Sequence, residues 1–175
     1  MSSIVAMPYF SQVDDGPDGW RLCQSASIAM CLAAVGYKNN GDDLWYVQCL
    51  KRHGDSTDQA AHARTLRDLK APGRFVTNCT IAQAKVEISK GRPVAVALLH
   101  HSSPAHPTGG HWIVLKGFDD TGWVVDDPYG ELDLAHGTWV RSGGKSGESK
   151  HYSYANMNPR WQVEGDGSGW AWLFG

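Results

Sequence analysis

Apolar residues follow two different patterns along the chain. Residues 27–35 are apolar on nearly every side and are followed by Gly36, a residue type that often comes directly after a helix. This pattern predicts a central buried helix with Cys23 at its start. Three amphipathic segments predict further helices at residues 43–53, 57–70 and 81–90.

The second half of the chain has the pattern of strands. Residues 93–99 form a continuous apolar run rich in β-branched side chains, which indicates a buried strand. Two further strands are predicted at residues 111–117 and 122–126, with a turn between them. The tail, residues 152–174, carries three tryptophans and is expected to supply at least one more strand. Helices followed by an antiparallel sheet predict an α+β fold.

Length and charge exclude several classes of protein. A chain of 175 residues, 42% of them hydrophobic, suits a single domain spanning residues 1–175. The net charge of -2 comes without a basic stripe, so we expect no nucleic-acid partner. Residues 1–10 lack the features of a signal peptide, and no segment is long enough to span a membrane, so we expect no membrane insertion and a start in a cytosol.

The four cysteines differ in their sequence context. Their spacings match no zinc pattern, and a reducing compartment argues against a disulfide framework. Cys23 stands at the start of the predicted central helix, where the free N–H groups and the helix dipole stabilise a thiolate. Cys31 lies two turns further into the apolar segment and fits a small core residue. Cys49 and Cys79 have no supporting pattern, so Cys23 is the candidate nucleophile.

A base and its orienting group are predicted from the strand pattern. His111 opens the predicted strand 111–117, and a side chain on the first residue of a rigid strand can be held accurately. The next strand ends in Asp126 and Asp127, and either carboxylate is placed to hold the imidazole in one tautomer. Strand alternation allows only one of the two to face His111, and Pro128 favours an extended Asp127.

Two groups of polar residues also have a metal-binding interpretation. Three loop histidines near His111 lack a carboxylate or cysteine at ligand spacing, so we expect them to line a cleft and predict no metal ion. A group of aspartates resembles a loose calcium loop but lacks the full ligand series, and a solvated acidic turn is the simpler interpretation. These residues are His100, His101, His106, Asp14, Asp15 and Asp18.

Four segments of the chain resemble the C39-like branch of the papain-fold cysteine peptidases. They are Pro8-Tyr9-Phe10-Ser11-Gln12, Cys23-x-x-Ala26-Ser27-x-Ala29-Met30-x-Leu32, Gly110-His111-Trp112-x-Val114-x-x-Gly117-Phe118-Asp119 and Asp127-Pro128-Tyr129-Gly130. The resemblance implies a papain-like fold, with the nucleophile at the start of a central helix packed on an antiparallel sheet. It also implies that Gln12 donates to the oxyanion, Cys23 attacks, His111 is the base and Asp127 orients it.

The chain departs from this family pattern next to the nucleophile. Gln24 stands where the pattern usually has glycine, and the loop from Gln12 to Cys23 is longer than in papain itself. Gln24 is therefore an alternative oxyanion donor. We also expect Gln24 to contact the substrate, together with the residues that flank the base, namely Gly110, Trp112 and His101.

A narrower resemblance concerns C39-like lysins encoded by tailed phages. It rests on Gly54-Asp55-Ser56-Thr57-Asp58, on residues 100–112 and on the tail from Tyr152 to Trp170. It implies cleavage of peptide bonds in bacterial peptidoglycan by a monomeric enzyme without a cofactor, made in the host bacterial cytoplasm and released to the wall. The alternatives are a protease that processes a protein or a leader, a non-catalytic papain-fold binding domain, and a zinc amidase.

Overall fold

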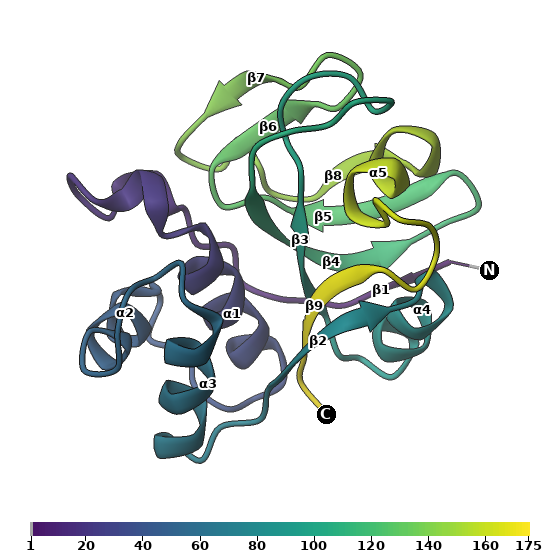
Figure 1. Cartoon of the computed structure of the whole chain (residues 1–175). Helices are drawn as coiled ribbons and strands as arrows, with labels where there is room; N and C mark the ends of the chain where they lie inside the picture. Colours follow the sequence, from purple (N-terminus) through teal and green to yellow (C-terminus); the bar gives the residue numbers. More distant parts are fainter. Residues whose placement is uncertain (1) are drawn as a thin grey trace.

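The computed structural model describes residues 2–175 and contains a seven-stranded antiparallel sheet with helices on both faces (Figure 1). The strand order is β2-β9-β3-β4-β5-β8, and β1 pairs with β4. A separate two-stranded sheet is formed by β6 and β7. The strands are β1 (Ser3–Ile4), β2 (Arg74–Cys79), β3 (Val94–Leu98), β4 (His111–Phe118), β5 (Gly122–Asp126), β6 (Gly130–Asp133), β7 (Thr138–Ser142), β8 (Lys150–Ser153) and β9 (Gly169–Leu173).

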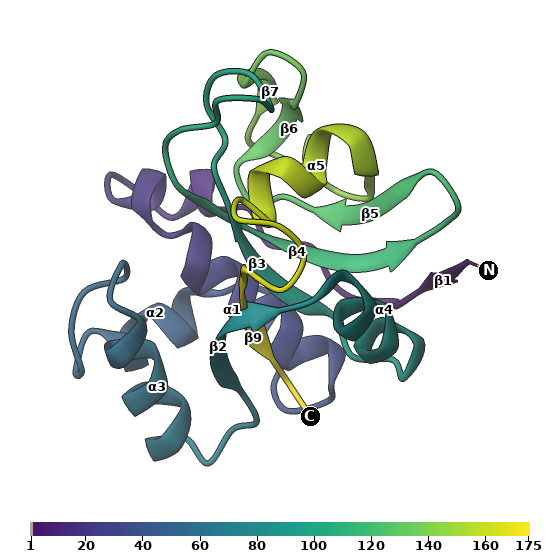
Figure 2. The ribbon, with the colours of Figure 1, turned by 45° about the vertical axis from the view of Figure 1, so that its right-hand side comes forward.

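The helices divide into two groups on opposite faces of the large sheet. The first group is gathered on one side of the molecule, where α1 packs on β3 and β4, while α4 and α5 pack on the other face (Figure 2). The bounds are α1 (Cys23–Ala34), α2 (Leu44–Leu50) and α3 (Gln59–Asp68) for the first group, then α4 (Ile81–Ser89) and α5 (Tyr154–Trp161). Two short 3-10 helices, η1 (Gln12–Asp14) and η2 (Gly19–Arg21), precede α1. None of the helices within residues 2–175 is long and apolar enough to cross a membrane.

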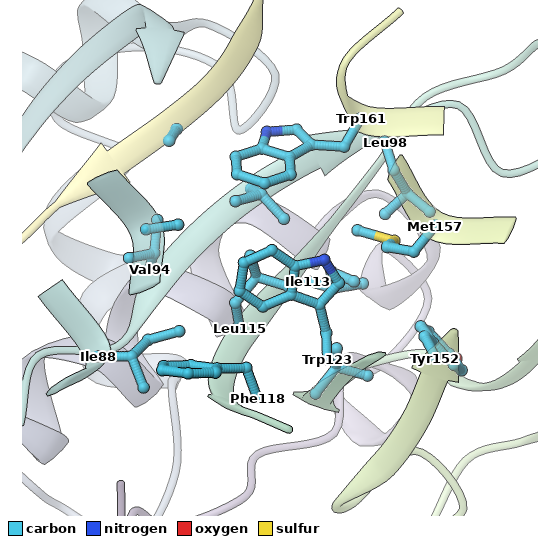
Figure 3. Packing of buried hydrophobic residues seen from close by; sticks show 14 of the residues in the cluster. Ile88, Val94, Leu98, Ile113, Leu115, Phe118, Trp123, Tyr152, Met157 and Trp161 are labelled. Carbon is cyan, nitrogen blue, oxygen red and sulfur yellow. The ribbon is translucent and has the colours of Figure 1, made fainter. Parts of the chain in front are cut away.

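Strand alternation explains why β3 and the central part of β4, Trp112–Leu115, are apolar at successive positions. Ile113 and Leu115 enter the core beneath α4 and α5, where Trp123 and Trp161 pack edge to face (Figure 3). The intervening Val114 enters the core beneath α1. Because successive side chains point to opposite faces, a strand covered on both faces is apolar at successive positions, apart from polar residues that have a buried partner, such as Lys116 with Asp126.

The end of α1 follows from a single glycine. Gly36 has a φ of +76°, a left-handed conformation that glycine adopts without strain. Its N–H donates to the carbonyl of Ala33 at 3.1 Å, and the N–H of Tyr37 donates to the carbonyl of Leu32 at 2.9 Å. This pair of bonds is a Schellman motif, which satisfies the last helical carbonyls and ends the helix.

The α+β class and the long apolar elements are confirmed, whereas several other elements were not predicted. The tail contains β8 and β9 as expected, but α5 lies between them. The pattern also did not predict β2, β6 or β7. The segment between β7 and β8 is not fully exposed, because Gly147 is buried and its carbonyl accepts the N–H of Asp127 at 2.9 Å.

Candidate active site

Cys23 is the first residue of α1 and its side chain is half-buried in a cleft. The first hydrogen bond of this helix runs from the N–H of Ala26 to the carbonyl of Leu22, at 3.0 Å. The N–H of Cys23 therefore precedes the helical ladder and is one of the donors that a helix leaves free at its N-terminus. Free donors and the positive end of the dipole both favour a thiolate at this position.

His111 and Asp127 form a buried contact beside Cys23. Nε2 of the His111 ring lies 2.7 Å from Oδ1 of Asp127, and the two side chains are 5% and 0% exposed. The carboxylate accepts, so the ring carries a proton on Nε2 and its other nitrogen, Nδ1, is left for Cys23. Cys23 and His111 line the same cleft, and the Cys23 thiol is near enough to raise the pKa of the ring.

The pairing of β4 with β5 brings these two residues together. The strands are antiparallel, with Val114 opposite Asp126, so the start of β4 lies beside the end of β5. Alternation then sends the two aspartates in different directions. Asp126 forms an ion pair with Lys116 at 2.9 Å, and Asp127 faces His111. The register therefore answers a question that the residue pattern had left open.

The charge on His111 is set by two opposing effects. Burial lowers the pKa of the ring. The charge of Asp127, its hydrogen bond and the nearby Cys23 outweigh this effect and raise the pKa to about 10. The imidazolium is consequently the dominant form at neutral pH. A cation next to a thiol favours the thiolate, so the geometry supports an ion pair between Cys23 and His111.

Asp127 is held by groups that the sequence did not identify as functional. Oδ1 also accepts the N–H of Tyr129 at 3.0 Å, and Oδ2 accepts the hydroxyl of Tyr152 at 3.5 Å. The main-chain carbonyl of Asp127 accepts the hydroxyl of Tyr9 at 2.8 Å. Burial and the nearby Asp127 charge raise the pKa of Tyr152 well above its usual value, so this phenol remains a donor. These bonds fix the carboxylate that orients His111.

A cleft of about 830 Å³ opens in front of these residues. Of the positions expected to bind substrate, Gln24, Gly110 and Trp112 line the cleft. His101 is not among the lining residues, because it is exposed and its ring lies against that of His100, with centroids 3.8 Å apart. Further lining residues are Arg21, Ser56, Thr57, Leu99, Glu164 and Trp170.

The comparison with family models identifies the chain. Residues 4–160 match the model of the Peptidase_C39 like family. The chain belongs to this family. A search of the curated proteins finds no match.

Solved structures of C39-like peptidases have the same fold. One is a C39-like peptidase from Bacillus anthracis, with a TM-score of 0.67 and 14% identity over 100% of this chain and 98% of that one. Another is the peptidase domain of Streptococcus ComA, described as a bi-functional ABC transporter involved in a quorum sensing pathway. Its TM-score is 0.57, with 16% identity over 98% of this chain and 97% of that domain. The α+β, papain-like architecture expected from the sequence is therefore confirmed.

The two glutamines of this C39-like peptidase occupy different environments. Gln12 is fully buried and does not line the cleft, and its Nε2 donates to the carbonyl of Gly19 at 2.8 Å. Gln24 is 1% exposed at the cleft wall, and neither polar atom of its amide has a partner within residues 2–175. An oxyanion role for Gln12 stays a prediction, and it would require the amide to exchange Gly19 for the substrate oxygen.

An aromatic hairpin covers the base. Trp139 of β7 stands perpendicular to the His111 ring, with centroids 5.2 Å apart, and the Tyr129 ring lies 4.4 Å from Trp139. This hairpin keeps water from one side of the imidazole. The alternation of Thr138, Trp139 and Val140 between glycines was the signal that could have predicted β7.

Arg160 organises the loop that leads into His111. Its side chain is fully buried and donates to main-chain carbonyls of Leu99 at 2.9 Å and His101 at 3.0 Å. Further bonds reach the carbonyls of Ser102 and Leu134. Burial of polar carbonyls is tolerated only when donors reach them, so Arg160 fixes this loop at the cleft wall.

Proposed function

We propose that this C39-like peptidase hydrolyses peptide bonds with Cys23 as nucleophile, His111 as general acid and base, and Asp127 as the orienting group. The contact of Asp127 with His111, in the cleft that Cys23 also lines, carries the proposal. A nucleophile, a base within reach and a group that orients the base are the parts that covalent acyl transfer needs.

The reaction follows from these positions. The Cys23 thiolate attacks the carbonyl carbon, and the electron pair of the carbonyl moves onto its oxygen. The N–H of Cys23 and one glutamine amide hold this oxyanion. When the intermediate collapses, the departing amine takes the proton of the His111 imidazolium, which leaves a thioester and a neutral imidazole. The imidazole then takes a proton from water, whose oxygen attacks the thioester carbon. The carbon–sulfur bond breaks, the acid product leaves, and the Cys23 thiolate and His111 imidazolium are restored.

As substrate we propose the peptide part of bacterial peptidoglycan. The three segments that resemble phage lysins lie far apart in the chain, yet each contributes to the wall of the cleft. Ser56 and Thr57 come from the first segment, Gly110 from the second and Glu164 from the third. Residues that line a cleft can contact the substrate, whereas core residues cannot. A resemblance to lysins at the cleft wall therefore supports a similar substrate.

The cleft also carries charges of both signs. Arg21 donates to both carboxylate oxygens of Asp55 at 2.9 Å, and Glu164 lines the cleft as well. The exposed ring of Trp170 adds an apolar surface. A mixed lining of this kind suits short peptides that carry carboxylates and amines next to small apolar side chains.

Digestion of purified sacculi tests the proposal. The parent protein should release new amino groups from sacculi and leave casein intact, and Cys23→Ala should release none. Cys31→Ala is the matched control, since that thiol is buried in the core and outside the proposed mechanism. Cleavage of casein alone would replace peptidoglycan by a protein substrate. Full activity of Cys23→Ala would refute the mechanism itself.

A further inference from the structure

The positively charged side chains that line the cleft are bound to oxygens of the protein itself. Arg21 donates to both carboxylate oxygens of Asp55 at 2.9 Å. The guanidinium of Arg160 is buried and donates to main-chain carbonyls. The ring of His111 is paired with Asp127. These groups therefore have little free capacity to bind an anionic part of a substrate.

Glu164 differs from the other charged residues of the cleft. It lines the cleft and is exposed, and its carboxylate has no ion pair or hydrogen bond to any group within residues 2–175. A free carboxylate among cations that are already paired gives this part of the cleft a negative potential. Such a site favours a ligand that carries a protonated amine.

The turn between α5 and β9 holds Glu164 in place. Gln162 is 6% exposed, and its Oε1 accepts the N–H of Gly167 at 2.9 Å and that of Ser168 at 3.1 Å. Nε2 of the same amide donates to the carbonyl of Cys79 at 2.9 Å, and the Ser168 hydroxyl accepts the N–H of Glu164 at 3.0 Å. The main chain of Glu164 is thus fixed before a ligand arrives, which lowers the entropy cost of binding.

Trp170 supplies an apolar surface directly after this turn. Its ring is 48% exposed and lines the cleft, and it packs edge to face on Phe75 with centroids 5.6 Å apart. Methylene groups of a long amine side chain can pack on such a ring, and the face of an indole also attracts a cation. A carboxylate and an indole are two groups that suit an alkylammonium ion.

We propose that Glu164 is a specificity residue that selects peptides with a protonated alkylamine, with Trp170 contacting the methylene groups that carry it. Lysine and related diamino acids have this chemistry. The inference rests on the proposed function, because it names the part of the peptide substrate that the cleft recognises. Glu164 takes no part in the bond-breaking steps and acts on substrate choice alone.

The experiment measures the binding of two tetrapeptides to the Cys23→Ala protein, which prevents cleavage during the titration. Both peptides consist of L-alanine, D-glutamate, L-lysine and D-alanine, and in one of them the lysine amine is acetylated. Acetylation should weaken binding about three- to tenfold, because it removes the charge that faces Glu164. Raising the salt from about 0.02 M to about 0.5 M should reduce this difference, since an open ion pair is screened. A merely structural role of Glu164 would give no such dependence on salt.

Three further variants, made in the same Cys23→Ala protein, test the role of the charge. Glu164→Gln should bind the two peptides alike, and Glu164→Lys should prefer a peptide whose lysine amine is succinylated. Asp166→Asn is the matched control, because Asp166 belongs to the same turn but does not line the cleft. Its carboxylate accepts the N–H of Ile81 at 2.7 Å, and an asparagine keeps this acceptor while losing the charge. This variant should retain the full preference for the amine.

The outcomes separate the specificity of the cleft from the proposed reaction. Equal binding of the two peptides to Cys23→Ala, or no binding of either, would overturn the inference even if the parent protein cleaves sacculi. A preference for the free amine that is lost in Glu164→Gln would support it. The same preference in a protein that hydrolyses no peptide bond would refute the proposed function and leave the amine site standing.

Discussion

Nε2 of His111 lies 2.7 Å from Oδ1 of Asp127, a residue one position beyond the end of β5. This contact fixes the ring so that the opposite nitrogen faces Cys23. The same contact raises the proton affinity of the ring. Orientation and charge therefore come from one hydrogen bond, and both can be tested separately.

The charge of Asp127 should determine the alkaline limit of activity. Burial lowers the pKa of His111, and the stronger opposing effect of Asp127 brings the pKa to about 10, so activity should fall as the pH rises through that value. In Asp127→Asn we expect the alkaline limb of kcat/KM to move down by more than about one pH unit. Asp126→Asn should leave it in place, since Asp126 faces Lys116. A limb unchanged in Asp127→Asn would show that this charge does not act on the base.

The stability of the fold should follow the same titration. The folded pKa of His111 lies above the unfolded value of 6.5, so its contribution is complete below that pH and is lost as the pH rises through about 10. Circular dichroism at each pH, on the parent and on Asp127→Asn, therefore has to accompany the kinetics. Rates measured at pH values at which the protein has unfolded are left out when the alkaline limb of kcat/KM is fitted.

Replacing each glutamine should identify the second oxyanion donor. Loss of such a donor raises the barrier by about 2.7–4 kcal/mol, which lowers kcat about 100- to 1000-fold. The structure favours Gln24, whose unpaired amide lines the cleft, so Gln24→Ala should show this loss. Gln12→Ala should mainly reduce stability, because Gln12 is buried and bonds to Gly19. The opposite result, a loss of kcat in Gln12→Ala alone, would assign the role to Gln12.

His62 should make the protein sensitive to acid. Its ring is fully buried between the Tyr46 hydroxyl at 2.9 Å and the Ser56 carbonyl at 2.9 Å, and burial lowers its pKa to about 4. Between the unfolded pKa of 6.5 and this value, the unfolded state takes up the proton and the folded state does not. Stability should therefore fall by about 3 kcal/mol as the pH drops from about 6.5 to 4.

Urea unfolding across this range measures the effect of His62. His62→Gln should be less stable at neutral pH but should lose less stability on acidification. Some dependence of stability on pH should remain in His62→Gln, because the pKa of His100 is also lowered, to about 3, by burial first and then by neighbouring positive groups. Equal slopes for the parent and His62→Gln would exclude His62 as the acid-sensitive group.

Arg160 should be among the side chains most important for stability. Arg160→Met keeps the length of the side chain but removes the charged donor from the carbonyls of Leu99, His101, Ser102 and Leu134, which should cost about 3 kcal/mol. Arg67→Met, on the exposed surface of α3, should change stability by less than about 0.5 kcal/mol. Limited proteolysis should also cut residues 100–110 faster in Arg160→Met, and equal cutting rates would show that Arg160 does not hold this loop.

The sequence determined the elements whose signal is local. The apolar run before Gly36 fixed α1, and the runs at β3, β4 and β5 are continuous because both faces of those strands are covered. The hairpin between β4 and β5 then placed a histidine near a carboxylate by chain geometry alone. By contrast, β2 and β7 are largely exposed and α5 contains Pro159, so local patterns did not reveal them.

The tertiary structure decided which polar groups meet. The β4–β5 register placed Asp127, and not Asp126, against His111, and folding of the β6–β7 hairpin brought Trp139 against the ring. The repeat of apolar residues that marks a helix or strand can be recognised in the sequence, because the residues that form such an element are neighbours in the chain. A buried polar pair joins residues far apart in the chain, and its existence depends on how whole elements pack.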